Sequence, residues 1–158
     1  MAEAAITSAI VEFHGFKDNE NRFVVKEFVV ESKYFRTQLI FDAPYSEELL
    51  SSKMRRTVFW LTNRFHFMRW QDRGIPYDEN LIRALCSPFK VLYTKGSEKV
   101  NFLKKFHNDV RDIEEAYTRS SGLKVTCILP QHNDNRGKCA LHSAKSFYRL
   151  KFESPAKN

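Results

Sequence analysis

The sequence is poor in glycine and cysteine and has no long apolar run. Its five glycines do not form the Gly-rich loop that cradles phosphates in a P-loop protein. Its three cysteines, an odd number without disulfide-framework spacing, favour a reducing compartment. No apolar run approaches the roughly 18 residues of a membrane span, and the first residues lack a basic signal region. We therefore expect a soluble intracellular protein of the cytoplasm or nucleus.

Positive charge and aromatic rings are abundant. The formal net charge is +7, which favours an anionic partner, with nucleic acid the first candidate. Aromatic residues make up 14% of the chain, including 14 phenylalanines, and predict a core filled with rings. A chain of 158 residues suits one domain better than two. We expect a single domain over residues 1–153 and a flexible tail over residues 154–158.

Three stretches near the N-terminus have the composition of β-strands. Residues 5–16, 22–31 and 34–41 are rich in β-branched and aromatic side chains. A polar turn separates the first two stretches, so we predict three consecutive antiparallel strands. Glu12 and His14 lie two residues apart and therefore share one face of the first strand.

A long helix is the clearest feature of the middle of the chain. Two acidic residues follow Ser46 in its predicted first turn, where the helix dipole favours negative charge. Apolar residues then recur at steps of three and four, at Leu50, Met54, Val58, Leu61, Phe65 and Met68. After it the sequence predicts a short helix over 78–85, a strand over 90–94, and a helix over 98–106 capped by Ser97.

The last part of the chain reads as a strand, a polar loop and a closing helix. Residues 125–129 form the predicted strand, and apolar residues at helical spacing mark the helix, namely Ala140, Leu141, Ala144, Phe147 and Tyr148. Three antiparallel strands followed by alternating helices and strands predict an α/β domain with a mixed sheet.

This order of elements resembles the ribonuclease-H-like fold in its exonuclease (DEDDh) form, which places four acidic residues and a histidine around two metal ions. The first strand of that family carries two acids separated by one residue, where this chain has Glu12 and His14. A later helix of the family opens near Asn-Ala-x-Phe-Asp, and the similar piece here, G-S-E-K-V-N-F-L, places Lys99 at the acid. The closing helix reads His-x-Ala-Leu-x-Asp-Ala, and K-C-A-L-H-S-A places Lys138 at the histidine and Ser143 at the acid.

These replacements have a direct chemical consequence. Two-metal hydrolysis needs several carboxylates to hold divalent ions about 4 Å apart at the scissile phosphate. A lysine at such a position puts positive charge where a metal would lie. The resemblance therefore implies a degenerate catalytic site, with no catalytic residue unless Glu12 still holds one Mg or Mn ion. The alternative is an active metal-dependent 3'-5' exonuclease or ribonuclease that uses Glu12.

A set of cysteines and histidines suggests a different metal. Cys127, His132 and Cys139 have the spacing C-x4-H-x6-C, which is similar to that of the Maelstrom domain, a ribonuclease-H-like module of small-RNA silencing. That domain has lost the acidic residues and binds zinc through Glu-Cys-His-Cys, which implies Glu12 as the fourth ligand here. His142, three residues after Cys139 on a helix, competes for that role. The alternative is that the cysteines are buried core residues and His132 is solvated. The sequence also looks similar to exonuclease-like domains of insect mobile elements and viruses.

Basic residues on three elements could follow a nucleic-acid backbone. They lie on the long helix, on the turn after the fourth strand, and before and within the closing helix: Lys53, Arg55 and Arg56; Lys95 and Lys99; Arg136, Lys138, Lys145 and Arg149. Arg64 and Arg69 lie on the same surface of the long helix, which is equally typical of a solvated face. Trp60, Trp70 and Tyr148 could stack bases or fill the core. We predict a binding module for RNA or single-stranded DNA rather than an enzyme; a protein-interaction domain is the further alternative.

Overall fold

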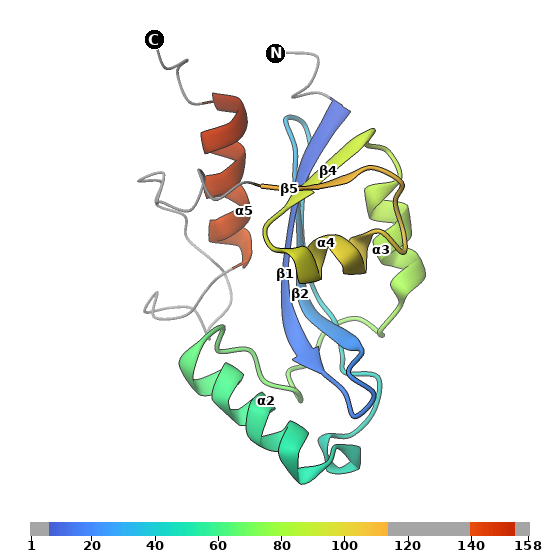
Figure 1. The fold of residues 1–158 in the computed structure, drawn as a ribbon, viewed down its shortest axis with the longest axis vertical. Helices are drawn as coiled ribbons and strands as arrows, with labels where there is room; N and C mark the ends of the chain where they lie inside the picture. Colours follow the sequence, from blue (N-terminus) through green and yellow to red (C-terminus); the bar gives the residue numbers. More distant parts are fainter. Residues whose placement is uncertain (1–6, 114–139, 154–158) are drawn as a thin grey trace.

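The first strand forms the centre of the sheet. The computed structural model describes residues 7–113 and 140–153 (Figure 1). Within it, β1 pairs antiparallel with β2 and parallel with β4, and the sheet order is β3-β2-β1-β4-β5. The strands are β1 (Ser8–Lys17), β2 (Phe23–Glu31), β3 (Arg36–Ile40), β4 (Val91–Thr94) and β5 (Val110–Asp112). This is the predicted α/β mixed sheet, with three antiparallel strands first, as in the ribonuclease-H-like fold.

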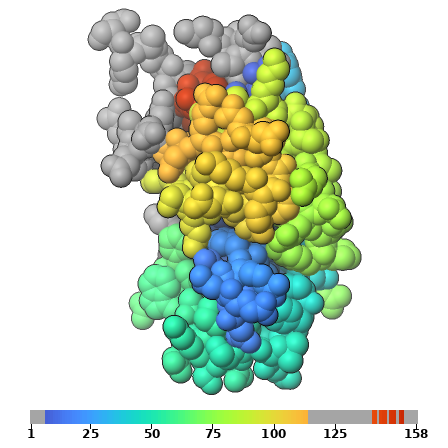
Figure 2. Space-filling view, turned by 45° about the vertical axis from the view of Figure 1, so that its right-hand side comes forward, coloured from blue at the N-terminus to red at the C-terminus, as the bar shows by residue number. Residues whose placement is uncertain are grey.

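Helices cover both faces of the sheet. The helical elements are η1 (Glu47–Leu49), α2 (Ser52–Arg64), α3 (Glu79–Cys86), α4 (Ser97–Leu103), α5 (Ala140–Tyr148) and the π-helical turn η4 (Arg149–Glu153). Figure 1 shows α5 on one face, α3 and α4 on the other, and α2 across one end. In Figure 2 the turn between β1 and β2 reaches the surface between α4 and α2. No helix in the described part of the chain is long and apolar enough to cross a membrane.

Alternation along β1 produces two cores. Ala9, Val11 and Phe13 point to the face covered by α3 and α4, where they pack in a large buried cluster. Ile10 points to the opposite face and packs with Val29 of β2 against the apolar side of α5. The predicted spacing of the closing helix is thereby confirmed, because its five apolar residues are all buried.

Polar contacts attach α5 to β2 in addition to this apolar packing. The buried carboxylate of Glu27 accepts a hydrogen bond from the Ala140 N–H at 3.4 Å, at the start of the helix. Lys145 lies 3.6 Å from Glu31, which also accepts a hydrogen bond from Arg36. The helix is therefore held in one position against the strand that carries both glutamates.

The predicted long helix is in fact two elements, which corrects the expectation of one helix starting at Ser46. Ser46 caps only η1, Leu50 is extended, and Ser51 caps α2 through a bond from the Met54 N–H. Asn19 of the β1–β2 turn contacts both sides of the break: its side-chain N–H donates to the Leu49 carbonyl, and its side-chain oxygen accepts from the Ser51 N–H. This contact comes from a distant part of the sequence. The last two predicted apolar positions, Phe65 and Met68, follow the end of α2.

One smaller expectation, the cap of α4, is also corrected, and one strand was missed. Ser97 is the first residue of α4 and does not cap it; the cap position is Gly96, whose φ of 102° suits glycine. The strand β5 was not predicted, because Val110 is its only buried residue. The predicted strand at 125–129 lies outside the described residues.

A bulge in β2 buries a lysine. The ladder pairs His14 with Glu27 and then Gly15 with Val25, which leaves Lys26 unpaired between them. The fully buried Lys26 ammonium donates to the carbonyls of Phe41 and Asp72, each at 2.7 Å. Burial lowers the pKa of Lys26 to about 8, although the carboxylates of Asp72 and Asp42 partly oppose the shift.

The lowered pKa of Lys26 predicts a pH dependence of stability. Between the folded pKa of about 8 and the ordinary lysine pKa of 10.5, the unfolded chain binds a proton that the folded chain lacks. Stability therefore rises with pH across this window, by about 2 kcal/mol from about pH 8 to about pH 10. Urea denaturation of the wild type and of Lys26→Met at both pH values measures it. All other groups titrate alike in both proteins, so the difference between their pH dependences of stability reports Lys26 alone. Identical pH dependence in the two proteins would contradict the prediction.

Candidate nucleic-acid interface

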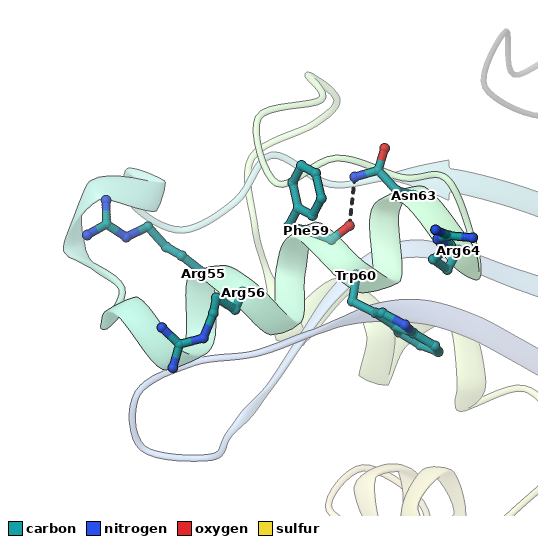
Figure 3. Close-up of a pocket in the computed structure, with 6 residues that line it drawn as sticks. All are labelled: Arg55, Arg56, Phe59, Trp60, Asn63 and Arg64. Carbon is teal, nitrogen blue, oxygen red and sulfur yellow. Dashed lines mark hydrogen bonds between the residues drawn. The ribbon is translucent and has the colours of Figure 1, made fainter.

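The outer side of α2 carries two rows of exposed side chains. Each row has an arginine, an aromatic residue one turn later and a polar residue one turn after that: Arg55, Phe59 and Asn63 in one, and Arg56, Trp60 and Arg64 in the other. Figure 3 shows Phe59 and Trp60 leaving the helix toward different sides. Phe59 is 70% exposed and Trp60 57% exposed. We call these six residues the α2 ridge. An open surface depression of about 570 Å³ lies among their side chains.

Packing of the opposite side of α2 fixes which residues form the ridge. Val58 is buried in a cluster with Leu50 and Trp70, and Met54 and Leu61 pack against that cluster. These positions follow helical spacing, so the residues between them must face solvent. The ridge is therefore a consequence of the same amphipathic pattern that docks α2 onto the sheet.

The cations of α2 have no acidic partner in the described part of the chain. Lys53, Arg55, Arg56 and Arg64 are all exposed, and none forms a salt bridge with a described carboxylate. Arginines elsewhere do form such pairs, namely Arg22, Arg36, Arg69, Arg73 and Arg111. No described carboxylate therefore neutralises the charge on the α2 ridge, which leaves it available to an external anion.

The other predicted basic residues are differently placed. Lys99 and Lys145 are half-buried in ion pairs with Glu12 and Glu31. Lys95 is half-buried, with its ammonium 5.8 Å from the ring centre of Phe147. Arg149 is exposed after α5, whereas Arg136 and Lys138 lie outside the described residues.

The three aromatic residues that could stack bases or fill the core lie in different environments. Trp60 is exposed on the ridge, whereas Trp70 is 1% exposed and donates its indole N–H to the Tyr45 carbonyl at 2.7 Å. Tyr148 is buried against Phe152. Trp70 and Tyr148 are therefore core residues. Sequence reasoning missed Phe59, although its position four residues after Arg55 already placed it on the solvated side of the helix.

Lys99 lies directly beside Glu12. The Lys99 Nζ is 2.5 Å from Glu12 Oε1, and only 5% of Glu12 is exposed. The same carboxylate oxygen accepts from the Phe13 N–H at 3.2 Å, and the ammonium lies 5.3 Å from the centre of the Phe13 ring. A second pair, Lys17 with Glu98 at 2.7 Å, joins β1 to the start of α4. The only described carboxylate of the predicted catalytic set is thus already neutralised by an ammonium.

The predicted zinc ligands fall mostly outside the described residues. Cys127, His132 and Cys139 are not described, and the side chain of His142 on α5 is not described either. Among the residues that are described, no three histidine, cysteine or acidic side chains gather closely enough to hold a metal ion. Glu12 is the one predicted ligand whose surroundings are known, through its contact with Lys99.

Comparisons with known proteins add no family to this picture. No protein-family model, no curated protein and no solved structure matches the chain. The strand order alone connects it to the ribonuclease-H-like topology.

Proposed function

We propose that the protein is a catalytically degenerate ribonuclease-H-like module that binds RNA or single-stranded DNA. The observation that carries the proposal is the α2 ridge, where arginines without described acidic partners stand beside exposed aromatic rings. Guanidinium groups bind phosphates by paired hydrogen bonds, and release of counterions from the nucleic acid drives the association. The net charge of +7 favours the same class of partner.

The contact between Glu12 and Lys99 favours binding without hydrolysis. A two-metal mechanism requires carboxylates that share divalent ions beside the scissile phosphate. Here the Glu12 carboxylate is already paired with an ammonium, whose charge repels a divalent cation. We therefore assign no catalytic residue, and Mg or Mn would matter only if the nuclease alternative were true.

Zinc is proposed as a structural ion for the segment before α5. Thiolates of Cys127 and Cys139 with the imidazole of His132 are donors that suit zinc. Glu12 would join them only if its ion pair with Lys99 opened, so we propose His142 as the fourth ligand. Elemental analysis should find one zinc per chain, and Cys127→Ser should lose both zinc and thermal stability. Full zinc content and stability in that variant would contradict the assignment.

The cysteine and histidine residues proposed to bind zinc, and the replaced catalytic acids, also support a more specific resemblance. We propose kinship with the Maelstrom domain and with exonuclease-like domains of insect mobile elements. A role in RNA silencing or in mobile-element biology would follow from that kinship.

A binding assay coupled to a cleavage assay tests the proposed function. Labelled single-stranded RNA is titrated on filters at about 50 mM and about 200 mM salt, then run on a denaturing gel. Four cations on α2 predict a slope near −2.8 in log affinity against log salt, which is about a 50-fold loss over that range. The RNA should stay intact with Mn²⁺ as it does with chelator. Salt-insensitive binding would overturn the proposal, and Mn²⁺-dependent cleavage lost in Glu12→Ala would establish the nuclease instead.

A further inference from the structure

We propose that the α2 ridge recognises unpaired bases, with Phe59 and Trp60 as the surfaces on which two bases of a single strand stack. This inference rests on the proposed function and specifies its ligand. Exposed apolar surface bordered by polar residues marks an interaction site more often than singly scattered apolar side chains do. Here two consecutive residues are 70% and 57% exposed on a helix whose other side is packed.

The spacing within each row matches the two parts of a nucleotide. In one row Arg55 precedes Phe59 by four residues, and in the other Arg56 precedes Trp60 by four, which is about 6 Å along the helix axis. A guanidinium binds a phosphate, and an aromatic ring stacks a base. Each row therefore offers one site for a phosphate and a neighbouring site for a base.

The two rows leave the helix toward different sides, which decides how a strand would lie (Figure 3). A strand that crosses the ridge places one base on Phe59 and the next on Trp60, with its backbone over the arginines. Arg64 then contacts the phosphate beyond Trp60. The bases must point away from each other, which a flexible single strand permits.

A duplex cannot use these rings in the same way. Paired bases are stacked on their neighbours inside the helix, so a protein reaches them only at the groove edges. On a duplex the α2 ridge would act through its cations alone. The exposed rings therefore favour a single strand, and because every base has a stacking face, they favour RNA and DNA alike.

A second copy of the chain is a poorer occupant of the ridge. Two-fold association places the same patch against itself. Arg55, Arg56 and Arg64 of one chain would then face those of the other, with no described acidic residue on the ridge to compensate. Charge complementarity thus selects a polyanion.

The experiment compares strands with and without bases. Oligouridylate, oligothymidylate, an abasic strand of equal length and a duplex are titrated at low salt by anisotropy. We expect the wild type to bind the two base-bearing strands roughly tenfold or more tightly than the abasic strand and the duplex. Phe59→Leu and Trp60→Leu should each lose about tenfold in affinity, and only for the base-bearing strands. Tyr34→Leu, which removes a 76% exposed ring from the β2–β3 turn, is the matched control and should change nothing.

Intrinsic fluorescence gives an independent readout. The chain has two tryptophans, of which Trp70 is buried and Trp60 exposed. Base-bearing strands should quench the emission of the wild type, and the abasic strand should not. The quenching should disappear in Trp60→Leu, whose fold is checked by circular dichroism.

The outcomes separate this inference from the proposed function. Equal binding of single strands, duplex and abasic strand would overturn the stacking role while leaving nucleic-acid binding intact. No binding to any of the four at low salt would overturn both. Self-association of the wild type in sedimentation, lost in Trp60→Leu, would identify the ridge as a protein interface and also overturn the inference.

Discussion

Replacing Lys99 with methionine is expected to lower the free energy of unfolding by about 3 kcal/mol. The substitution keeps the length of the side chain but removes the charge that neutralises Glu12, which is 5% exposed. A buried carboxylate without its partner typically costs about 3–5 kcal/mol. The 19% exposure of the Lys99 side chain places the expected loss at the lower end, since water partly screens the pair.

A double variant tests whether the loss of stability in Lys99→Met comes from the broken ion pair. Glu12→Gln together with Lys99→Met removes both charges, so most of the stability should return. Lys104→Met, at the exposed C-terminal end of the same helix, is the matched control. Urea denaturation measures all four proteins. If Lys99→Met cost no more than Lys104→Met, Lys99 would not be the partner that neutralises Glu12.

Replacing Arg55, Arg56 and Arg64 together with glutamine is expected to weaken the binding of single-stranded RNA by roughly a hundredfold at about 50 mM salt. Each arginine is exposed and has no described acidic partner, so its charge is available to a phosphate. Glutamine retains helix propensity and a polar surface, which leaves the fold of α2 unchanged.

The control for the arginine variant removes the same charge elsewhere. Lys33, Lys90 and Lys104 are exposed and lie outside α2, and their joint replacement by glutamine lowers the net charge equally. This control should lose far less affinity than the α2 variant, because only long-range attraction is reduced. Equal losses in the two variants would mean that total charge matters and the ridge does not.

Elements defined by burial were predictable from the sequence. The three N-terminal strands and the closing helix were found because their apolar residues follow the period of the structure that buries them. The break between η1 and α2 was not, since the contacts that Asn19 makes on either side of it come from 30 and 32 residues away. β5 is held by pairing with β4, and a three-residue strand leaves no pattern of its own.

The sequence predicted which kinds of residue form the site, but it did not predict which of them are exposed together on one surface. The sequence placed Lys53, Arg55 and Arg56 on a helix face, and the structure leaves them exposed. Lys99 looked equivalent, yet it contacts Glu12, 87 residues away. Trp60 and Trp70 looked equivalent as well, and only the packing of the loop after α2 buries Trp70. Which cations and rings remain accessible is a tertiary property.

The salt dependence of RNA binding shows whether the cations of α2 hold the phosphates of a nucleic acid. The slope of log affinity against log salt is measured for the wild type and for the variant with Arg55, Arg56 and Arg64 replaced by glutamine. Each phosphate contact on a single strand contributes about 0.7 to the slope, so the variant should be shallower by about 2. Equal slopes for the two proteins, or a flat slope for the wild type, would show that these arginines do not contact the phosphates.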